Sequence, residues 1–333
     1  MRSAQPFSER RVKTPKKTRI YFACDVHGSE QCFRKFLNVA KYNIYSANVI
    51  MLSGDLTGKA IVAVVETTPG HYEIKAKGFE SKVNSKDELE KAMMRVRNQG
   101  FYPKILSPGE FKEYSEDPSL PSKALLAEIV ETMQHWLTMA EERLEGLSVS
   151  CYIMPGNDDA VEISPLLGGR KNIVNPEDRV VQLDEHHEMI SLGFSNPTPW
   201  HTPRECTEEE LSSRIDALAG KVKDMKNCIF NFHVPPYGST LDSAPLLDEN
   251  LRPRIIAGDF VMVPVGSTAV RSAIEHYQPL LGLHGHIHES SGFVKIGRTA
   301  CLNAGSEYSQ GILKGLVVDL DSSGVGRYLR VQG

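Results

Sequence analysis

The sequence predicts an α/β layer fold, and three observations lead to this class. Short apolar runs typical of buried strands alternate along the chain with segments of helical periodicity. Several of these runs end at Asp, Asn or His next to glycine. The 333 residues are 41% hydrophobic and 24% charged, as in a globular protein of one large domain or two ordinary ones.

The first segments show the alternation of strand and helix clearly. Thr18–Cys24 reads as a buried strand, Ser29–Tyr42 as a helix and Asn48–Leu52 as a second buried strand. The helix is expected because its apolar residues share one side, namely Cys32, Phe33, Phe36, Leu37 and Ala40. Both strands end at an acidic residue, where α/β sheets gather ligands.

Residues 59–118 interrupt this rhythm. Ile61–Val65 and Tyr72–Ala76 flank a Thr-Pro-Gly turn and predict a hairpin. Ser85 predicts a capped helix that continues through Val96, and Phe101–Leu106 is a further candidate strand. We therefore expect an inserted α+β subdomain at 59–118, which could act as a lid, a dimer contact or a partner surface.

The remaining chain returns to the α/β pattern. Apolar residues at intervals of three and four predict a long helix from about Ser122 to Leu147, and Ser267 predicts a cap for a helix over Thr268–Tyr277. The expected strands are Val149–Met154, Val180–Leu183, Met189–Phe194, Cys228–Phe232, Leu280–Leu283, Phe293–Ile296 and Leu313–Leu320.

Charge and composition narrow the class of partner. The net charge of −4 argues against a general nucleic-acid-binding surface. Basic residues are concentrated in residues 1–17, which we interpret as a flexible tail, with a weak phosphate or nucleic-acid contact as the alternative. No stretch approaches the roughly 20 apolar residues of a membrane span, and no apolar run follows the basic residues as in a secretory signal.

The six cysteines are scattered, without a Cys-x-x-Cys pair, and three lie within apolar runs. This pattern indicates small core residues of a reduced, cytoplasmic protein rather than a disulfide framework. The sequence leaves the oligomeric state open, with a homodimer as one possibility.

The strongest functional pattern is that a potential metal ligand follows each of five apolar runs. A single Asp after a strand is usually a helix cap, and a single His is usually an ordinary polar residue, but five such ends would be a large coincidence. The residues concerned are Asp25 and His27, Asp55, Asn157, His233, and His286 and His288. This mixed oxygen and nitrogen set suits Mn, Fe, Zn, Co or Ni, with Mn favoured, and seven ligands suggest two ions rather than one.

These segments, in this order, resemble the calcineurin-like metallophosphoesterases. The motifs are Asp-x-His, Gly-Asp, Gly-Asn-x-Asp, His and Gly-His-x-His, and they extend from Asp25 to His288. The surrounding residues are also similar to a prokaryotic group of predicted phosphoesterases related to cyclic-nucleotide phosphodiesterases. The resemblance implies a two-sheet α/β/β/α sandwich over residues 18–333, interrupted by the 59–118 insert.

The resemblance also implies roles for the ligands. One ion would be bound by Asp25, His27 and His288, and the other by Asn157, His233 and His286. Asp55 would bridge the two ions, and a hydroxide between them would attack the phosphorus of a small phosphoester.

The chain departs from the family pattern at position 158. Many members have a histidine there that assists the leaving group, whereas this chain has Asp158. Two neighbouring cations are expected to lower the pKa of this carboxyl, so it would be a poor acid. We therefore expect a preference for phosphodiesters or activated esters; the alternative is that Asp158 is a structural carboxylate.

Three further residues are weaker candidates for substrate contact. His201 could line the substrate site or belong to an ordinary loop, and Tyr237 follows His233 closely in the chain. His284 could enter the same site or be a buried strand residue. Two other functions stay open: a phosphomonoesterase acting on a nucleotide, sugar phosphate or phosphoprotein, and an inactive metal-binding scaffold of the same fold.

Overall fold

The computed structural model describes residues 17–76 and 81–333, and its main body contains two six-stranded sheets. The predicted basic tail, apart from Lys17, therefore lies outside the described residues. No helix in the described ranges is long and apolar enough to cross a membrane. All six cysteines are free thiols, and five of them are buried.

The first sheet has the strand order β20-β19-β1-β2-β7-β8. Four neighbouring strands, β1, β2, β7 and β8, run parallel, and β19 and β20 complete one edge in antiparallel pairing. The strands are β1 (Thr18–Ala23), β2 (Val49–Ser53), β7 (Ser150–Met154), β8 (Ile173–Val174), β19 (Lys314–Asp321) and β20 (Gly324–Gln332).

The second sheet has the order β17-β18-β16-β11-β10-β9. Its four central strands are parallel, and the strand at each edge is antiparallel to its neighbour. The strands are β9 (Val180–Gln182), β10 (Glu188–Leu192), β11 (Cys228–Phe232), β16 (Leu281–His284), β17 (Gly292–Ile296) and β18 (Thr299–Asn303).

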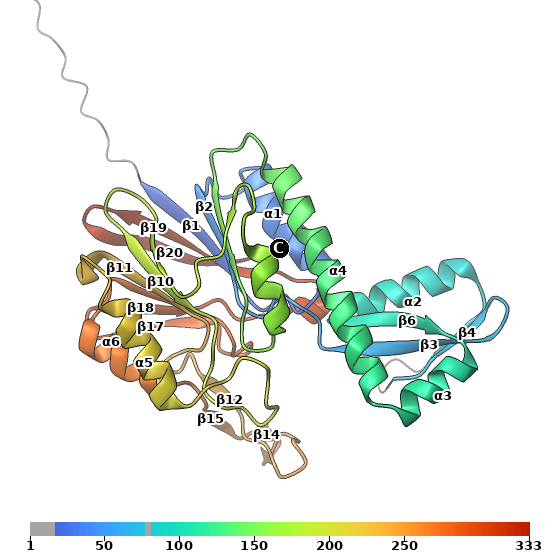
Figure 1. The fold of residues 1–333 in the computed structure, drawn as a ribbon. Helices are drawn as coiled ribbons and strands as arrows, with labels where there is room; N and C mark the ends of the chain where they lie inside the picture. The colour runs from blue at the N-terminus through green and yellow to red at the C-terminus, as the bar shows by residue number, and fades with distance from the viewer. Residues whose placement is uncertain (1–16, 77–80) are drawn as a thin grey trace, which may run out of the picture.

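Apolar side chains bind these sheets to each other and to the helices outside them. Between the sheets, Phe22 and Met51 of one belong to the same buried cluster as Ile229 and Leu283 of the other. Helices α1 (Glu30–Lys41) and α4 (Ser119–Leu144) cover the first sheet, and α5 (Glu208–Ala219) and α6 (Thr268–Tyr277) cover the second. The result is a four-layer α/β sandwich (Figure 1).

Between β2 and α4 the chain builds a separate four-stranded sheet, ordered β5-β4-β3-β6. The predicted hairpin is confirmed, since β3 (Ala60–Thr68) and β4 (His71–Ile74) pair antiparallel. The other elements are β5 (Ser81–Val83), α2 (Lys86–Asn98), β6 (Phe101–Leu106) and α3 (Pro108–Glu116). This sheet has its own small core and lies to one side of the sandwich (Figure 1). The insert limits of 59–118 stay a prediction.

Most predicted elements are present with ends that differ by a few residues. The α1 helix is capped by Ser29, whose side chain accepts a hydrogen bond from the Cys32 backbone N–H. The long helix begins at Ser119, three residues before the prediction, because Pro121 falls in its first turn, where no intrahelical N–H is needed.

Several elements were not predicted. They include the helices α3 and α5, the strands β5, β8, β18 and β20, and two small antiparallel pairs, β12 (Ser243–Pro245) with β15 (Met262–Pro264) and β13 (Ile255–Ile256) with β14 (Asp259–Phe260). Both missed helices have a capping box, formed by Ser107 with Glu110 and by Thr207 with Glu210.

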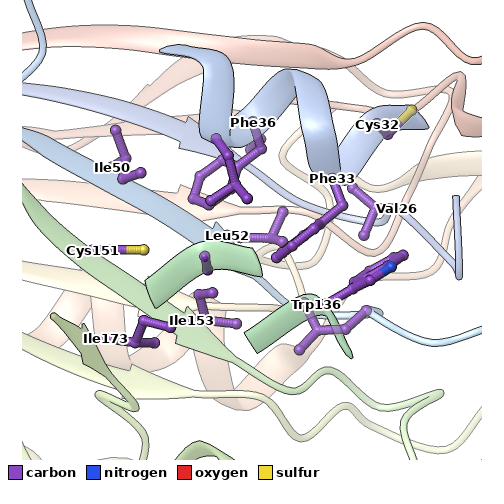
Figure 2. Packing of buried hydrophobic residues seen from close by; sticks show 14 of the residues in the cluster. Val26, Cys32, Phe33, Phe36, Ile50, Leu52, Trp136, Cys151, Ile153 and Ile173 are labelled. Carbon is purple, nitrogen blue, oxygen red and sulfur yellow. The ribbon is translucent and has the colours of Figure 1, made fainter. Parts of the chain in front are cut away.

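Trp136 is the largest fully buried side chain and joins α4 to the first sheet and α1. Its ring stacks on Phe33 with a centroid distance of 4.3 Å and an interplanar angle of 9° (Figure 2). Its indole N–H is buried without a hydrogen-bond partner, so the residue contributes through apolar packing alone.

We expect Trp136→Ala to lower the free energy of unfolding by about 3–5 kcal/mol, because it leaves a cavity at this contact. Trp136→Phe should cost less than about 1.5 kcal/mol, since an aromatic ring remains and the unpaired N–H is removed. Urea denaturation of both variants measures the difference, and equal destabilisation would contradict the packing role.

Candidate metal centre

The predicted ligands lie at the carboxyl ends of parallel strands in both sheets. The strands of the first sheet lead into Asp25, His27, Asp55 and Asn157, and those of the second into His233, His286 and His288. Because the sheets pack face to face, these two sets of strand ends meet at one edge of the sandwich.

The side chains form two groups that share Asp55. One contains Asp25, His27, Asp55 and His288, and the other contains Asp55, His233 and His286. In each group, one potential ligand atom from every residue lies within 4.8 Å of the others. The two groups could therefore each hold a metal ion.

Individual distances show how closely the ligand atoms converge. His27 Nε2 lies 3.0 Å from His288 Nε2 and 3.6 Å from Asp55 Oδ2. His288 Nε2 lies 3.5 Å from Asp25 Oδ1, and His233 Nε2 lies 3.3 Å from Asp55 Oδ1. Carboxylate oxygens and imidazole nitrogens thus point at common positions from both sheets.

Unpaired atoms of His233 and Asn157 fit a metal site. His233 Nδ1 lies 3.3 Å from Ser53 O, an acceptor, which leaves the lone pair on the buried and unpaired Nε2. Asn157 Nδ2 donates to Thr202 Oγ1 at 2.9 Å, while its buried Oδ1 has no hydrogen-bond partner. Both free atoms are of the kind that binds a divalent cation.

The protonation states of the group also favour cation binding. Burial and then Lys59 hold the pKa of His27 well below its usual range, and burial and then His233 lower the pKa of His286 to about 4. Although burial acts in the opposite direction, His288 lowers the pKa of Asp25 to about 2, and His233 lowers that of Asp55. Ionised carboxylates and neutral imidazoles are the forms that bind metals.

His233 differs from the other histidines in this respect. Burial would lower its pKa, but the Asp55 and Asp25 carboxylates outweigh burial and raise the pKa to about 9. The two aspartates thus favour a positive charge at this position, which a bound cation would supply in place of a proton.

The backbone is unusual at this site. Asp25, His27, Asp55 and His286 all have positive φ, between 41° and 64°. Such left-handed conformations cost free energy in non-glycine residues and are concentrated at functional sites. Hydrogen bonds stabilise them here: Asp25 N donates to Gly54 O, and His286 N donates to the Asp25 carboxylate at 3.1 Å.

Two glycines permit the close approach of the segments. A Cβ at Gly54 would overlap the His233 ring, and a Cβ at Gly156 would overlap Asp55. Gly54 also has a φ of +97°, which side chains with a Cβ rarely adopt.

Asp159 links the loop after β2 to the loop after β7. Its fully buried carboxylate accepts hydrogen bonds from the backbone N–H groups of Leu56, Thr57 and Gly156 and from the Thr57 hydroxyl. Burial and the nearby Asp55 raise its pKa to about 6. It is a positioning residue for Asp55 and Asn157 rather than a ligand.

Arg204 supports the same loop from the other side. Its buried guanidinium pairs with Glu177 and donates from Nε to Gly156 O at 2.9 Å, and its backbone N–H donates to Asn157 O. The segment that carries His201 and Thr202 is thereby attached to the Asn157 loop.

Asp158 lies at the partly exposed side of the group. Its Oδ2 is 3.6 Å from His27 Nδ1 and 3.5 Å from Lys59 Nζ, and its backbone N–H donates to Asp55 Oδ1. Burial and then Asp55 raise the pKa of Asp158, while Lys59 acts to lower it. Two bound cations would add an effect in the lowering direction.

The three weaker candidates occupy different environments. His201 and Tyr237 are exposed. His201 directly precedes Thr202, whose hydroxyl accepts a hydrogen bond from Asn157, and Tyr237 lies on the loop that follows His233. His284 is fully buried, and its Nδ1 lies 2.8 Å from Phe232 O, which favours the alternative of a buried strand histidine.

Comparison with known proteins identifies a sequence relative. The chain is 34% identical over 166 residues to the uncharacterized protein MJ1162 of Methanocaldococcus jannaschii, a match that covers 67% of that protein and 49% of this chain. The chain belongs to the MJ1162 family. Because MJ1162 is itself uncharacterized, membership of its family brings no activity with it. No family model matches the chain.

Solved structures show likeness of fold. The crystal structure of TT1561 from Thermus thermophilus superposes with a TM-score of 0.52 at 14% identity, over 96% of this chain and 99% of that one. An archaeal phosphodiesterase gives a TM-score of 0.33 at 10% identity, covering 95% of this chain and 100% of that one, which is too low to support an argument.

The sequence alone gives Lys59 and Tyr308 no place in this region. Asp159 ends the Gly-Asn-x-Asp motif, but its role as a positioning residue becomes visible only from its hydrogen bonds. No pattern in the sequence indicates Tyr308, although its ring centroid lies 4.7 Å from that of His27 and 5.8 Å from that of His288.

We expect Asp159→Asn to lower the free energy of unfolding by about 2–3 kcal/mol, because an amide NH₂ would face buried backbone donors. The bound Mn²⁺ per chain should fall with it, since Asp55 and Asn157 lose their common support. Denaturation and metal analysis test both effects.

Asp178→Asn makes the same chemical change at an exposed carboxylate that is 3.9 Å from Arg214. It should change stability by less than about 0.5 kcal/mol. Equal effects of the two variants would refute the positioning role of Asp159.

Proposed function

We propose that this chain is a binuclear metal-dependent phosphoesterase that prefers phosphodiesters, with Mn²⁺ as the favoured metal. The observation that supports this most strongly is the pair of ligand groups that share Asp55. A carboxylate with one oxygen near each group is suited to bridge two cations, the arrangement used by paired-metal hydrolases.

The first ion would be held by Asp25, His27 and His288, and the second by Asn157, His233 and His286. When bound, the ions would activate a water molecule as nucleophile and stabilise negative charge on the phosphoryl oxygens. The chain contributes the fixed geometry. The Asp158 backbone N–H orients Asp55 Oδ1, and Ser53 O orients the His233 ring.

The substrate preference is inferred from Asp158. A histidine at this position could donate a proton to a departing alkoxide. At Asp158 the positive charge of Lys59, 3.5 Å away, favours the ionised carboxylate, although burial and Asp55 act in the opposite direction. Substrates with a good leaving group need less help of this kind, which favours activated esters and diesters.

The proposal predicts Mn²⁺-dependent hydrolysis of bis(p-nitrophenyl) phosphate. Asp55→Ala and His233→Ala should each reduce kcat/KM by more than about 100-fold, since loss of a ligand should exceed the effect of losing a group that only orients one. Release of p-nitrophenolate measures the rate, and metal analysis measures the loss of bound ions.

His186→Ala is the matched control, because His186 is an exposed histidine away from the ligand groups. It should retain wild-type activity and metal content. A folded, metal-loaded protein that hydrolyses no member of a broad phosphoester panel would instead support the inactive scaffold.

The preference for diesters is tested separately. We expect kcat/KM for bis(p-nitrophenyl) phosphate to exceed that for a simple alkyl phosphate monoester by at least about 100-fold, the scale of one lost proton-transfer catalyst. Comparable values for the two substrates would favour the phosphomonoesterase alternative.

A further inference from the structure

Lys59 places a positive charge beside the candidate metal centre. Its Nζ lies 3.5 Å from Asp158 Oδ2 and 6.0 Å from the centroid of the Tyr308 ring. Tyr308 in turn contacts the rings of His27 and His288. The ammonium group therefore stands on the side of the centre formed by His27 and His288.

The backbone of Lys59 is held firmly although its side chain is 39% exposed. Lys59 N donates to Gly100 O at 2.8 Å, and the preceding Gly58 N donates to the buried Tyr102 hydroxyl at 3.0 Å. Gly100 also packs so closely on His27 O that a Cβ there would overlap it. The end of α2 and the start of β6 thus fix the position from which the Lys59 side chain extends.

The acidic groups around Lys59 favour its protonated form. Burial acts to lower its pKa, but Tyr308, Asp158 and Asp55 outweigh burial, and the pKa lies above its ordinary value. A lysine ammonium has three N–H donors, so an ion pair with Asp158 leaves donors for a further oxygen.

Asp158 without Lys59 would be unfavourable for an anionic substrate. Its carboxylate is 25% exposed and close to the ligand groups, so it would repel the oxygens of a phosphoryl group. The lysine compensates this charge at the position where many proteins of similar motif have a histidine.

We propose that Lys59 binds a non-esterified oxygen of the substrate phosphoryl group and that Asp158 positions the lysine for this contact. The inference rests on the proposed phosphoesterase function and assigns a substrate-binding residue to it. The first residue of the insert would then belong to the active site, whether or not the rest of the insert covers that site.

The test compares Lys59→Met with Lys104→Met. Lys104 lies on β6 of the insert, has similar exposure and has a carboxylate partner, Glu128, at 3.8 Å. With bis(p-nitrophenyl) phosphate and Mn²⁺, Lys59→Met should raise KM and the inhibition constant of inorganic phosphate about tenfold, the equivalent of 1.4 kcal/mol. Lys104→Met should change neither constant, and Lys59→Arg should restore most of the loss.

The double variant Lys59→Met with Asp158→Asn distinguishes charge from structure. If Lys59 compensates the carboxylate, removing both charges should recover part of the phosphate affinity lost in Lys59→Met. Unchanged KM and phosphate inhibition in Lys59→Met would overturn the proposal, as would a loss of bound Mn²⁺ in that variant, which would make Lys59 structural.

Calorimetric titration of inorganic phosphate into the Mn²⁺-saturated proteins separates this proposal from the activity itself. An inert wild type that binds phosphate about tenfold more tightly than Lys59→Met would contradict the phosphoesterase function and still support the lysine contact. Equal phosphate affinity of the two proteins would contradict the lysine contact whether or not the wild type is active.

Discussion

The apolar contact between the two six-stranded sheets determines where every candidate ligand lies. Each ligand lies within four residues of the end of a strand, so its position depends on the position of the strand end. Phe22 and Met51 on one sheet and Ile229 and Leu283 on the other hold the sheets in one alignment. A small change in that alignment would separate Asp55 from His233, because the two residues belong to different sheets.

The site itself is locally unfavourable, and the surrounding structure compensates for it. Four ligand residues have left-handed backbone conformations, and two buried carboxylates lie close together. Backbone hydrogen bonds between neighbouring loops, and the network around Asp159, provide the compensation. The stable sandwich thus allows a concentration of strain and charge that an isolated loop could not maintain.

The strands and their ligand residues could be predicted because each is a local pattern. An apolar run followed by Asp or His is visible without knowledge of its neighbours, and the order of the motifs carried the resemblance. Contacts such as Lys59 with Asp158, and Tyr308 with His27, join segments far apart in sequence and depend on packing. No local pattern encodes them.

The missed elements have two different causes. The helices α3 and α5 begin with capping boxes, Ser107 with Glu110 and Thr207 with Glu210, so the sequence carries a local signal for the start of both. The β13–β14 pair has no apolar and polar alternation, since Ile255, Ile256 and Phe260 are all exposed. Such a hairpin does not show the period of a half-buried strand.

The length of α4 has a mechanical consequence. Its 26 residues make a rod of about 39 Å, and its buried residues, from Ile129 to Leu144, attach the second part of the rod to the sandwich. The first part extends beside the four-stranded sheet (Figure 1). A tilt of about 10° around Ile129 would displace Ser119, the first residue of the helix and about 15 Å away at a rise of 1.5 Å per residue, by roughly 3 Å. Lys59 lies at the other junction between insert and sandwich, between β2 and β3. The same tilt would displace Lys59 less than the distal end of the four-stranded sheet, because Lys59 is closer to the sandwich.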